Sequence, residues 1–83
     1  MAAGPRRYID GFMVRGEAVM LDKGVLAIEI VVSREDGGLE ARWSLPRFVT
    51  FPDMASALRH AELVLAGILS IDPATGEPRY GIL

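Results

Sequence analysis

The sequence of 83 residues contains no cysteine, one histidine and one tryptophan. The absence of cysteine excludes disulfide bonds and thiol chemistry, and it is typical of proteins in a reducing compartment, so we expect a cytoplasmic location. The single histidine, His60, has no cysteine and no second histidine with which to share a metal ion. The sequence therefore gives no reason to expect a metal or any other cofactor.

The chain also lacks an excess of charge of one sign and a long apolar run. Its net charge is −2 and its pI is about 5.2, so no overall field attracts it to nucleic acid or to an anionic membrane. The longest apolar window, Ala61 to Ile71, contains Glu62 and is much shorter than the roughly 20 residues that span a bilayer. Arg6-Arg7 near the N-terminus is followed by no apolar signal segment. We therefore expect a soluble protein with no membrane association.

Apolar residues are abundant instead. The chain is 51% hydrophobic and 24% charged, with a mean hydropathy of +0.28, which is ample for a packed core. The length predicts a single domain over residues 1–83, with residues 1–6 as a flexible tail. Large apolar patches are uncommon on monomers, so an apolar surplus in so small a chain predicts that another molecule covers part of it.

The range Asp53–Ile71 has the apolar spacing of an amphipathic helix. Asp53 suits the N-cap, and Pro73 disfavours helical backbone at the preceding residue, so the helix is expected to end by Asp72. The apolar residues recur every three or four positions, which places them along one side of a helix. They are Met54, Ala57, Leu58, Ala61, Val64, Leu65, Ile68 and Ile71.

The part of the chain before this helix alternates short apolar segments with glycine-containing turns. Its first half is open to two interpretations: strands over Tyr8–Val14 and Ala18–Leu21 joined by a turn at Gly16-Glu17, or one bent strand with a bulge at Gly16. Further strands are predicted over Val25–Val32 and Leu39–Leu45, with a short edge strand over Arg47–Phe51. The predicted fold is α+β, an antiparallel β-meander of three to five strands packed on one C-terminal α-helix.

Two registers are open for the two central strands. A four-residue turn places Ile28 opposite Trp43, whereas a two-residue turn places Ile30 there. The first also sets Glu29 opposite Arg42, a cross-strand ion pair worth about 0.2–1 kcal/mol, and is slightly favoured for that reason. Because the registers differ by two residues, both bury the same face of the first strand with the tryptophan. That predicted core face consists of Leu26, Ile28, Ile30 and Val32.

The second half of the predicted helix is apolar on nearly all sides, so either the C-terminal tail or a second copy should cover it. Small residues on its outer side would let another helix approach closely. The candidate interface on the helix consists of Leu63, Ala66, Gly67 and Ser70. A second candidate surface is the outer face of the central strand, with Val25, Ala27 and Val31.

No arrangement of residues typical of a catalytic site is present, so we expect a protein that is not an enzyme. The serines lack any nucleophile context such as Gly-x-Ser-x-Gly, and His60 is expected to be an ordinary surface or interface residue. Glu29 is flanked by apolar residues, as a functional carboxylate can be, but an ion pair with Arg42 or Arg34 is the favoured interpretation.

The order of elements resembles that of small uncharacterised bacterial proteins, some of them prophage-encoded. The shared features are a Tyr8-x-x-Gly11 strand start, a meander, and Thr50–Asp53 opening a helix that carries Ala57 and Ala61 and ends at Ile71-Asp72. Those proteins consist of a β-meander followed by one helix. The resemblance implies a non-enzymatic accessory or assembly protein, and it carries no catalytic residues.

The expected function is therefore protein–protein interaction or assembly, including self-association as a homo-oligomer or binding of another protein. The alternative is a weak nucleic-acid-binding accessory protein that uses arginines on the sheet face. Neighbouring acidic residues balance these arginines, and Trp43, the best stacking group, falls on the predicted core face.

Overall fold

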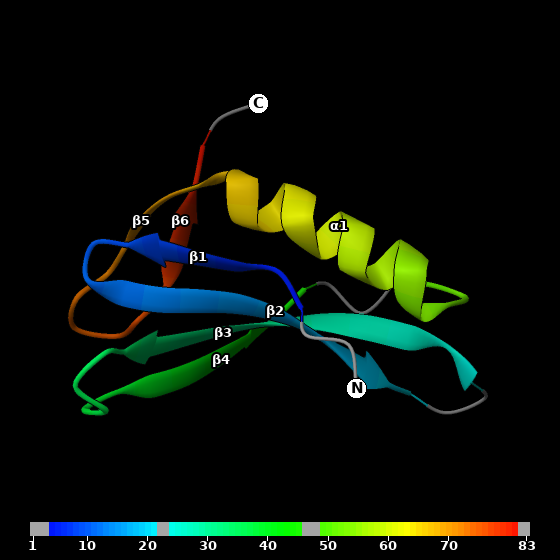
Figure 1. Cartoon of the computed structure of the whole chain (residues 1–83), viewed down its shortest axis with the longest axis horizontal. Helices are drawn as coiled ribbons and strands as arrows, with labels where there is room; N and C mark the ends of the chain where they lie inside the picture. The colour runs from blue at the N-terminus through cyan, green and yellow to red at the C-terminus, as the bar shows by residue number, and fades with distance from the viewer. Residues whose placement is uncertain (1–3, 22–23, 46–48, 82–83) are drawn as a thin grey trace.

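The computed structural model describes residues 4–21, 24–45 and 49–81, and these form an α+β fold (Figure 1). A four-stranded antiparallel sheet has the order β1-β2-β3-β4, and β5 and β6 form a separate two-stranded hairpin. The predicted α+β class, with its antiparallel meander and a single helix toward the C-terminus, is confirmed. In chain order the elements are β1 (Arg6–Ile9), β2 (Phe12–Met20), β3 (Leu26–Arg34), β4 (Glu40–Ser44), α1 (Met54–Ala66), β5 (Ile68–Ile71) and β6 (Pro78–Tyr80).

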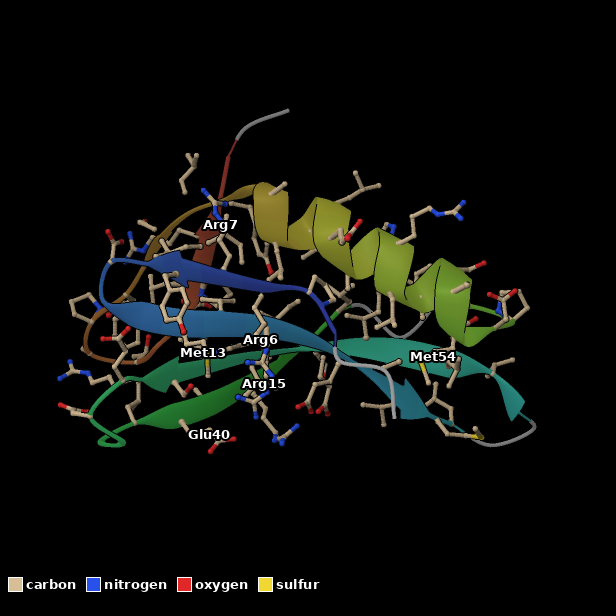
Figure 2. All side chains as sticks on the ribbon, in the orientation of Figure 1. Arg6, Arg7, Met13, Arg15, Glu40 and Met54 are labelled. Carbon is tan, nitrogen blue, oxygen red and sulfur yellow. The ribbon has the colours of Figure 1, made fainter. Side chains whose placement is uncertain are left out.

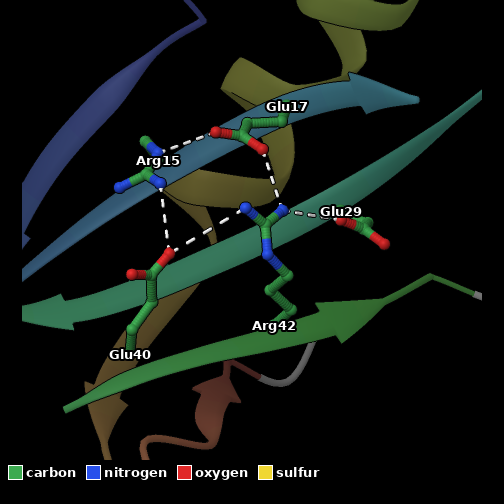
Figure 3. A network of polar contacts seen from close by, with 5 residues as sticks. All are labelled: Arg15, Glu17, Glu29, Glu40 and Arg42. Carbon is green, nitrogen blue, oxygen red and sulfur yellow. Dashed lines mark hydrogen bonds and ion pairs between the residues drawn. The ribbon is translucent and has the colours of Figure 1, made fainter.

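The core lies between one face of the four-stranded sheet and a layer made of α1 and the β5–β6 hairpin. The predicted core face of β3 is buried as expected, and it packs against the helix and β5. The other face of the sheet has no element over it among the described residues (Figures 1 and 3). The buried residues from the second layer are Ala57, Ala61, Leu65, Ile68, Ile71, Gly76 and Pro78.

The first hairpin turns at Asp10-Gly11, and both sequence interpretations of this region are wrong. Asp10 and Gly11 have positive φ angles of 53° and 82°, as a two-residue hairpin turn of type I′ requires. β2 then continues without a bulge through Gly16, which lies opposite Ile30. A Cβ atom at Gly16 would lie 2.8 Å from the Cβ of Ala61, so this glycine lets the helix approach the sheet.

The N-terminal segment is attached to the sheet over part of the expected tail. β1 begins at Arg6, and the carbonyl oxygen of Pro5 accepts a hydrogen bond of 3.0 Å from the backbone N–H of Gly16. Pro5 and Arg6 therefore take part in the edge of the sheet. Residues 1–3 of the expected tail lie outside the described residues.

The register of β3 and β4 is the second of the two that the sequence allows. Ile30 lies opposite Trp43, so the slightly favoured register is wrong, while β3 is buried as predicted. Along β4, exposed residues alternate with partly buried ones. The ion pair that favoured the other register is nonetheless present. Glu29 Oε1 accepts a hydrogen bond of 2.9 Å from Arg42 Nη1 along a diagonal, so this pair did not discriminate between the registers.

The helix begins as predicted but ends earlier. Asp53 is the N-cap, and its carboxylate accepts a hydrogen bond of 2.7 Å from the N–H of Ser56. The predicted end at Ile71 is wrong, because the helix stops at Ala66, Gly67 is its C-cap, and Ile68–Ile71 form β5. The ends of that strand, Ile68 and Ile71, are both buried, and their spacing of three also fits the buried side of a helix.

Two smaller predictions concern segments that the structure describes in part. Of the edge strand expected over Arg47–Phe51, Phe51 forms a single antiparallel bridge with Leu26, while residues 47 and 48 lie outside the described residues. The sequence Asp22-Lys23-Gly24 also predicts a turn after Leu21. The N–H of Leu21 donates a 2.8 Å hydrogen bond to the carbonyl of Val25 on the other side of it, but residues 22 and 23 likewise lie outside the described residues. No helix in the described part of the chain has the length and apolarity needed to cross a membrane.

Candidate interaction surfaces

The outer face of the sheet, which faces away from α1, carries a network of charged side chains from β2, β3 and β4 (Figure 3). Arg42 Nη1 lies 2.9 Å from both Glu17 Oε1 and Glu29 Oε1, and Arg15 Nε lies 2.8 Å from Glu17 Oε2. Glu40 Oε1 is 3.5 Å from Arg15 and 3.9 Å from Arg42. Two guanidinium groups are thus shared among three carboxylates.

The network shifts the pKa values of Glu17 and Arg42 in the direction that keeps both side chains ionised. Hydrogen bonds from Arg15 and Arg42 lower the pKa of Glu17 below its ordinary value of 4.5. Hydrogen bonds to Glu17 and Glu29 raise the pKa of Arg42. The outer face is therefore charged but internally balanced, with few free charges available to a partner.

Replacing Glu17 by glutamine is expected to reduce the acid sensitivity of the fold. Because the pKa of Glu17 is lower in the folded state, its stabilisation is complete above pH 4.5 and is lost as the pH falls through the folded pKa. Urea unfolding at pH 6 and pH 3 should show a smaller decrease for E17Q than for wild type, by about 1 kcal/mol or less because the pair is solvent-exposed. The difference should shrink in molar salt, and identical decreases would contradict the predicted role.

Val31, one of the predicted interface residues, lies beneath this network. It is fully buried and lies opposite both Arg15 and Arg42, so it is not accessible to a partner. Val25 and Ala27 remain partly exposed and line a groove at the end of β2 and β3. The three residues of the second candidate surface therefore do not form one accessible patch.

The most exposed apolar side chains near the helix gather where α1 ends and the β5–β6 hairpin begins. Leu63 is 67% exposed, Leu69 is 70% exposed and Tyr80 is 46% exposed. We call these three residues, with Ala66 and Gly67, the helix-end patch. The patch borders an apolar groove of about 390 Å³. The groove is lined by Leu45, His60, Leu63, Val64, Gly67, Tyr80 and Gly81.

The helix-end patch contains three of the four residues predicted for the helix interface. The fourth, Ser70, lies in β5, where it pairs with Arg79 of β6. The C-terminal strand covers part of the flank of Gly67, whose carbonyl accepts a hydrogen bond of 2.9 Å from the N–H of Gly81. Of the two alternatives for what covers this side of the helix, the C-terminal segment therefore covers part of it. The side chains of Leu63 and Leu69 stay exposed.

Sequence reasoning missed Leu69 and Tyr80 as members of this patch. Leu69 was placed inside the helix, although the turn-forming residues from Asp72 to Gly76 between two apolar segments are typical of a hairpin. In the structure Asp72 Oδ1 accepts a 2.8 Å hydrogen bond from the N–H of Ala74, which stabilises that turn. A hairpin interpretation would have placed Leu69 and Tyr80 together.

His60 lies in an apolar environment. Its ring packs on that of Phe51 with the ring centroids 5.1 Å apart, and it lines the helix-end groove. Within the described residues, no three His, Cys, Asp or Glu side chains are grouped so that they could hold a metal ion. His60 thus contributes to packing and to the wall of the groove.

Comparison of the chain with protein-family models, with curated proteins and with solved structures gives no significant match.

Proposed function

We propose that this protein is a non-enzymatic interaction module that self-associates through the helix-end patch. The observation that carries the proposal is an apolar groove lined by Leu63, which is 67% exposed, and by Tyr80, with Leu69 70% exposed in the adjoining strand β5. Contiguous apolar surface of this kind on a small protein is typical of a contact site for another protein. The proposal includes an accessory or assembly role and a cytoplasmic location, the latter supported by the lack of cysteine.

The shape of the patch supports a second copy as the partner. A contact with two-fold symmetry uses the same surface on both subunits, so the surface must carry both protruding and receiving features. The exposed leucines and the groove beside them satisfy this requirement on one patch. On the outer face of the sheet, by contrast, burial would desolvate the charged network, and desolvation of ion pairs is costly.

The alternative of nucleic-acid binding has less support in the geometry. Arg15 and Arg42, the arginines at the centre of the sheet face, each contact two or more glutamates. Trp43 packs against the core instead of presenting its ring to the solvent side of the sheet. A phosphate backbone would have to compete with three carboxylates for the two arginines.

Sedimentation velocity with a charged substitution in the patch tests the proposal. Wild type should sediment as a dimer at several hundred micromolar, and L63E should weaken the association at least about tenfold, since it places a charge in the apolar contact. M20E is the matched control, because Met20 is 69% exposed but lies at the far end of β2. A wild type that stays monomeric, or equal effects of both substitutions, would refute the proposal.

A further inference from the structure

The solvent-facing side of α1 has a sequence order that is symmetric about its centre. One exposed stripe consists of Ala55, Arg59, Glu62 and Ala66, at spacings of four, three and four residues, which aligns them on one side of the helix. The opposite side of the helix, with Ala57, Ala61 and Leu65, is buried. Along the stripe the side chains are therefore small, basic, acidic and small. When the helix is turned end to end, the small residues fall on the same positions and the basic and acidic residues change places.

This order fits a second copy of the same helix running in the opposite direction. A two-fold axis that crosses the helix between residues 60 and 61 would bring Arg59 next to the partner's Glu62, and the reverse pair follows by symmetry. A parallel arrangement would instead bring like charges together. The charge pattern thus selects both the partner, which is the chain itself, and the relative direction of the two helices.

The sizes of the side chains suit the same arrangement. Ala55 and Ala66 at the two ends of the stripe would lie opposite each other and allow the helix axes to approach to about 8–10 Å. Leu63, which is adjacent to the stripe and belongs to the helix-end patch, would be covered at the edge of the contact. Neither Arg59 nor Glu62 forms an ion pair within the described residues, so both charges remain available.

We infer that the protein forms a two-fold symmetric dimer in which the α1 helices pack antiparallel, with reciprocal Arg59–Glu62 ion pairs across the interface. This inference rests on the proposed self-association, and it centres the contact on the exposed stripe of α1, with Leu63 of the helix-end patch at its edge. A helix of 13 residues is about 20 Å long, so the contact is of modest size, and the expected affinity is in the micromolar range.

Charge reversal provides a test that separates this geometry from other modes of dimerisation. R59E makes the stripe wholly acidic and E62R makes it wholly basic, so each variant alone should dimerise about tenfold more weakly than wild type. An equimolar mixture of the two should form a heterodimer, because each acidic stripe then faces a basic one. The double variant R59E/E62R, which restores one charge of each sign, should dimerise within about threefold of wild type.

Sedimentation velocity on each sample gives the association constants, and circular dichroism verifies that the variants are folded. A wild-type dimer that is insensitive to both single reversals would overturn the antiparallel geometry and leave the proposed self-association in place. Failure of the mixed sample to form a heterodimer would overturn it too. A wild type that is monomeric at several hundred micromolar would remove both the proposed function and this inference.

Discussion

Replacing Gly16 by valine is expected to destabilise the fold by about 3 kcal/mol, because it forces α1 away from the sheet. A Cβ atom at this position would lie 2.8 Å from the Cβ of Ala61 and 3.6 Å from Cγ of Pro5. Ala61 is fully buried and its Cβ has no rotamer to change, so the clash can be relieved only by a shift of the backbone of α1 or of β2. For 83 residues the expected free energy of unfolding is roughly 4–12 kcal/mol. A loss of this size should therefore lower the urea concentration at the unfolding midpoint by a clearly measurable amount.

Gly67 supplies the matched control for a glycine substitution without a clash. Its φ angle is −84°, and an added Cβ would meet the carbonyl oxygens of Val64 and Leu63 at 3.5 Å and 3.7 Å, which is ordinary contact. G67A should therefore leave stability unchanged or raise it by up to about 1 kcal/mol through the unfolded state.

A double-mutant cycle tests whether a substitution of Gly16 destabilises the fold through its contact with Ala61 of the helix. G16A should be destabilising on its own, and A61G should cost about 1 kcal/mol through helix propensity. The double variant G16A/A61G should be more stable than the sum of the two losses predicts, because the removed methyl group makes room for the added one. Simple additivity, or a G16V variant as stable as wild type, would mean that β2 and α1 are not in this close contact.

The centre of the fold was predictable because its pattern depends only on neighbouring residues. The alternation along β4 and the apolar run of β3 determine which side chains face the core, and a register error of two residues changes none of them. The N-cap was predictable for the same reason, since Asp53 acts on the N–H of Ser56 three residues away. Gly16 was interpreted as a turn or bulge because the sequence does not show that Ala61 faces it.

The candidate interface was predicted in part. The predictions that fail are those that depend on contacts between residues far apart in the sequence. Leu63 and Ala66 belong to the helix whichever way it ends, so they were found. Leu69 and Tyr80 join the patch only because residues after Ala66 leave the helix and form a hairpin. Val31 was assigned to an open face because the sequence does not reveal that side chains from two neighbouring strands close over it.

The apolar surplus that first indicated a partner is not removed by the early end of the helix. A helix reaching to Ile71 would bury Ile68 and Ile71, and the hairpin buries them too, while Leu69 is 70% exposed. Of the seven large apolar side chains that are exposed among the described residues, three belong to the helix-end patch. Self-association is therefore supported by the location of these three side chains and by the charge order beside them, more than by the total amount of apolar surface.

The substitution R7M is expected to destabilise the fold by about 2–3 kcal/mol, because Arg7 terminates the helix. Its Nη1 donates hydrogen bonds to the carbonyls of Leu65 at 2.7 Å and of Ile68 at 3.0 Å, with a weaker contact to Ala66 at 3.4 Å (Figure 2). Hydrogen bonds from a charged donor are worth about 1.5–3 kcal/mol, and a cation at the C-terminal end of a helix is favourable as well. Methionine keeps much of the apolar stem but removes the donors.

Arg6 is the control, since it is the neighbouring arginine on the same strand but lies on the outer face opposite Arg15 (Figure 2). R6M should change the free energy of unfolding by less than about 0.5 kcal/mol. Hydrogen exchange gives a local readout, because R7M should accelerate exchange at the N–H of Gly81, which donates to the carbonyl of Gly67. Equal stabilities of R7M and R6M would show that the helix ends at Ala66 without Arg7. A selective loss in R7M would show that a residue 58 positions from Leu65 sets that end, which no local pattern in the sequence encodes.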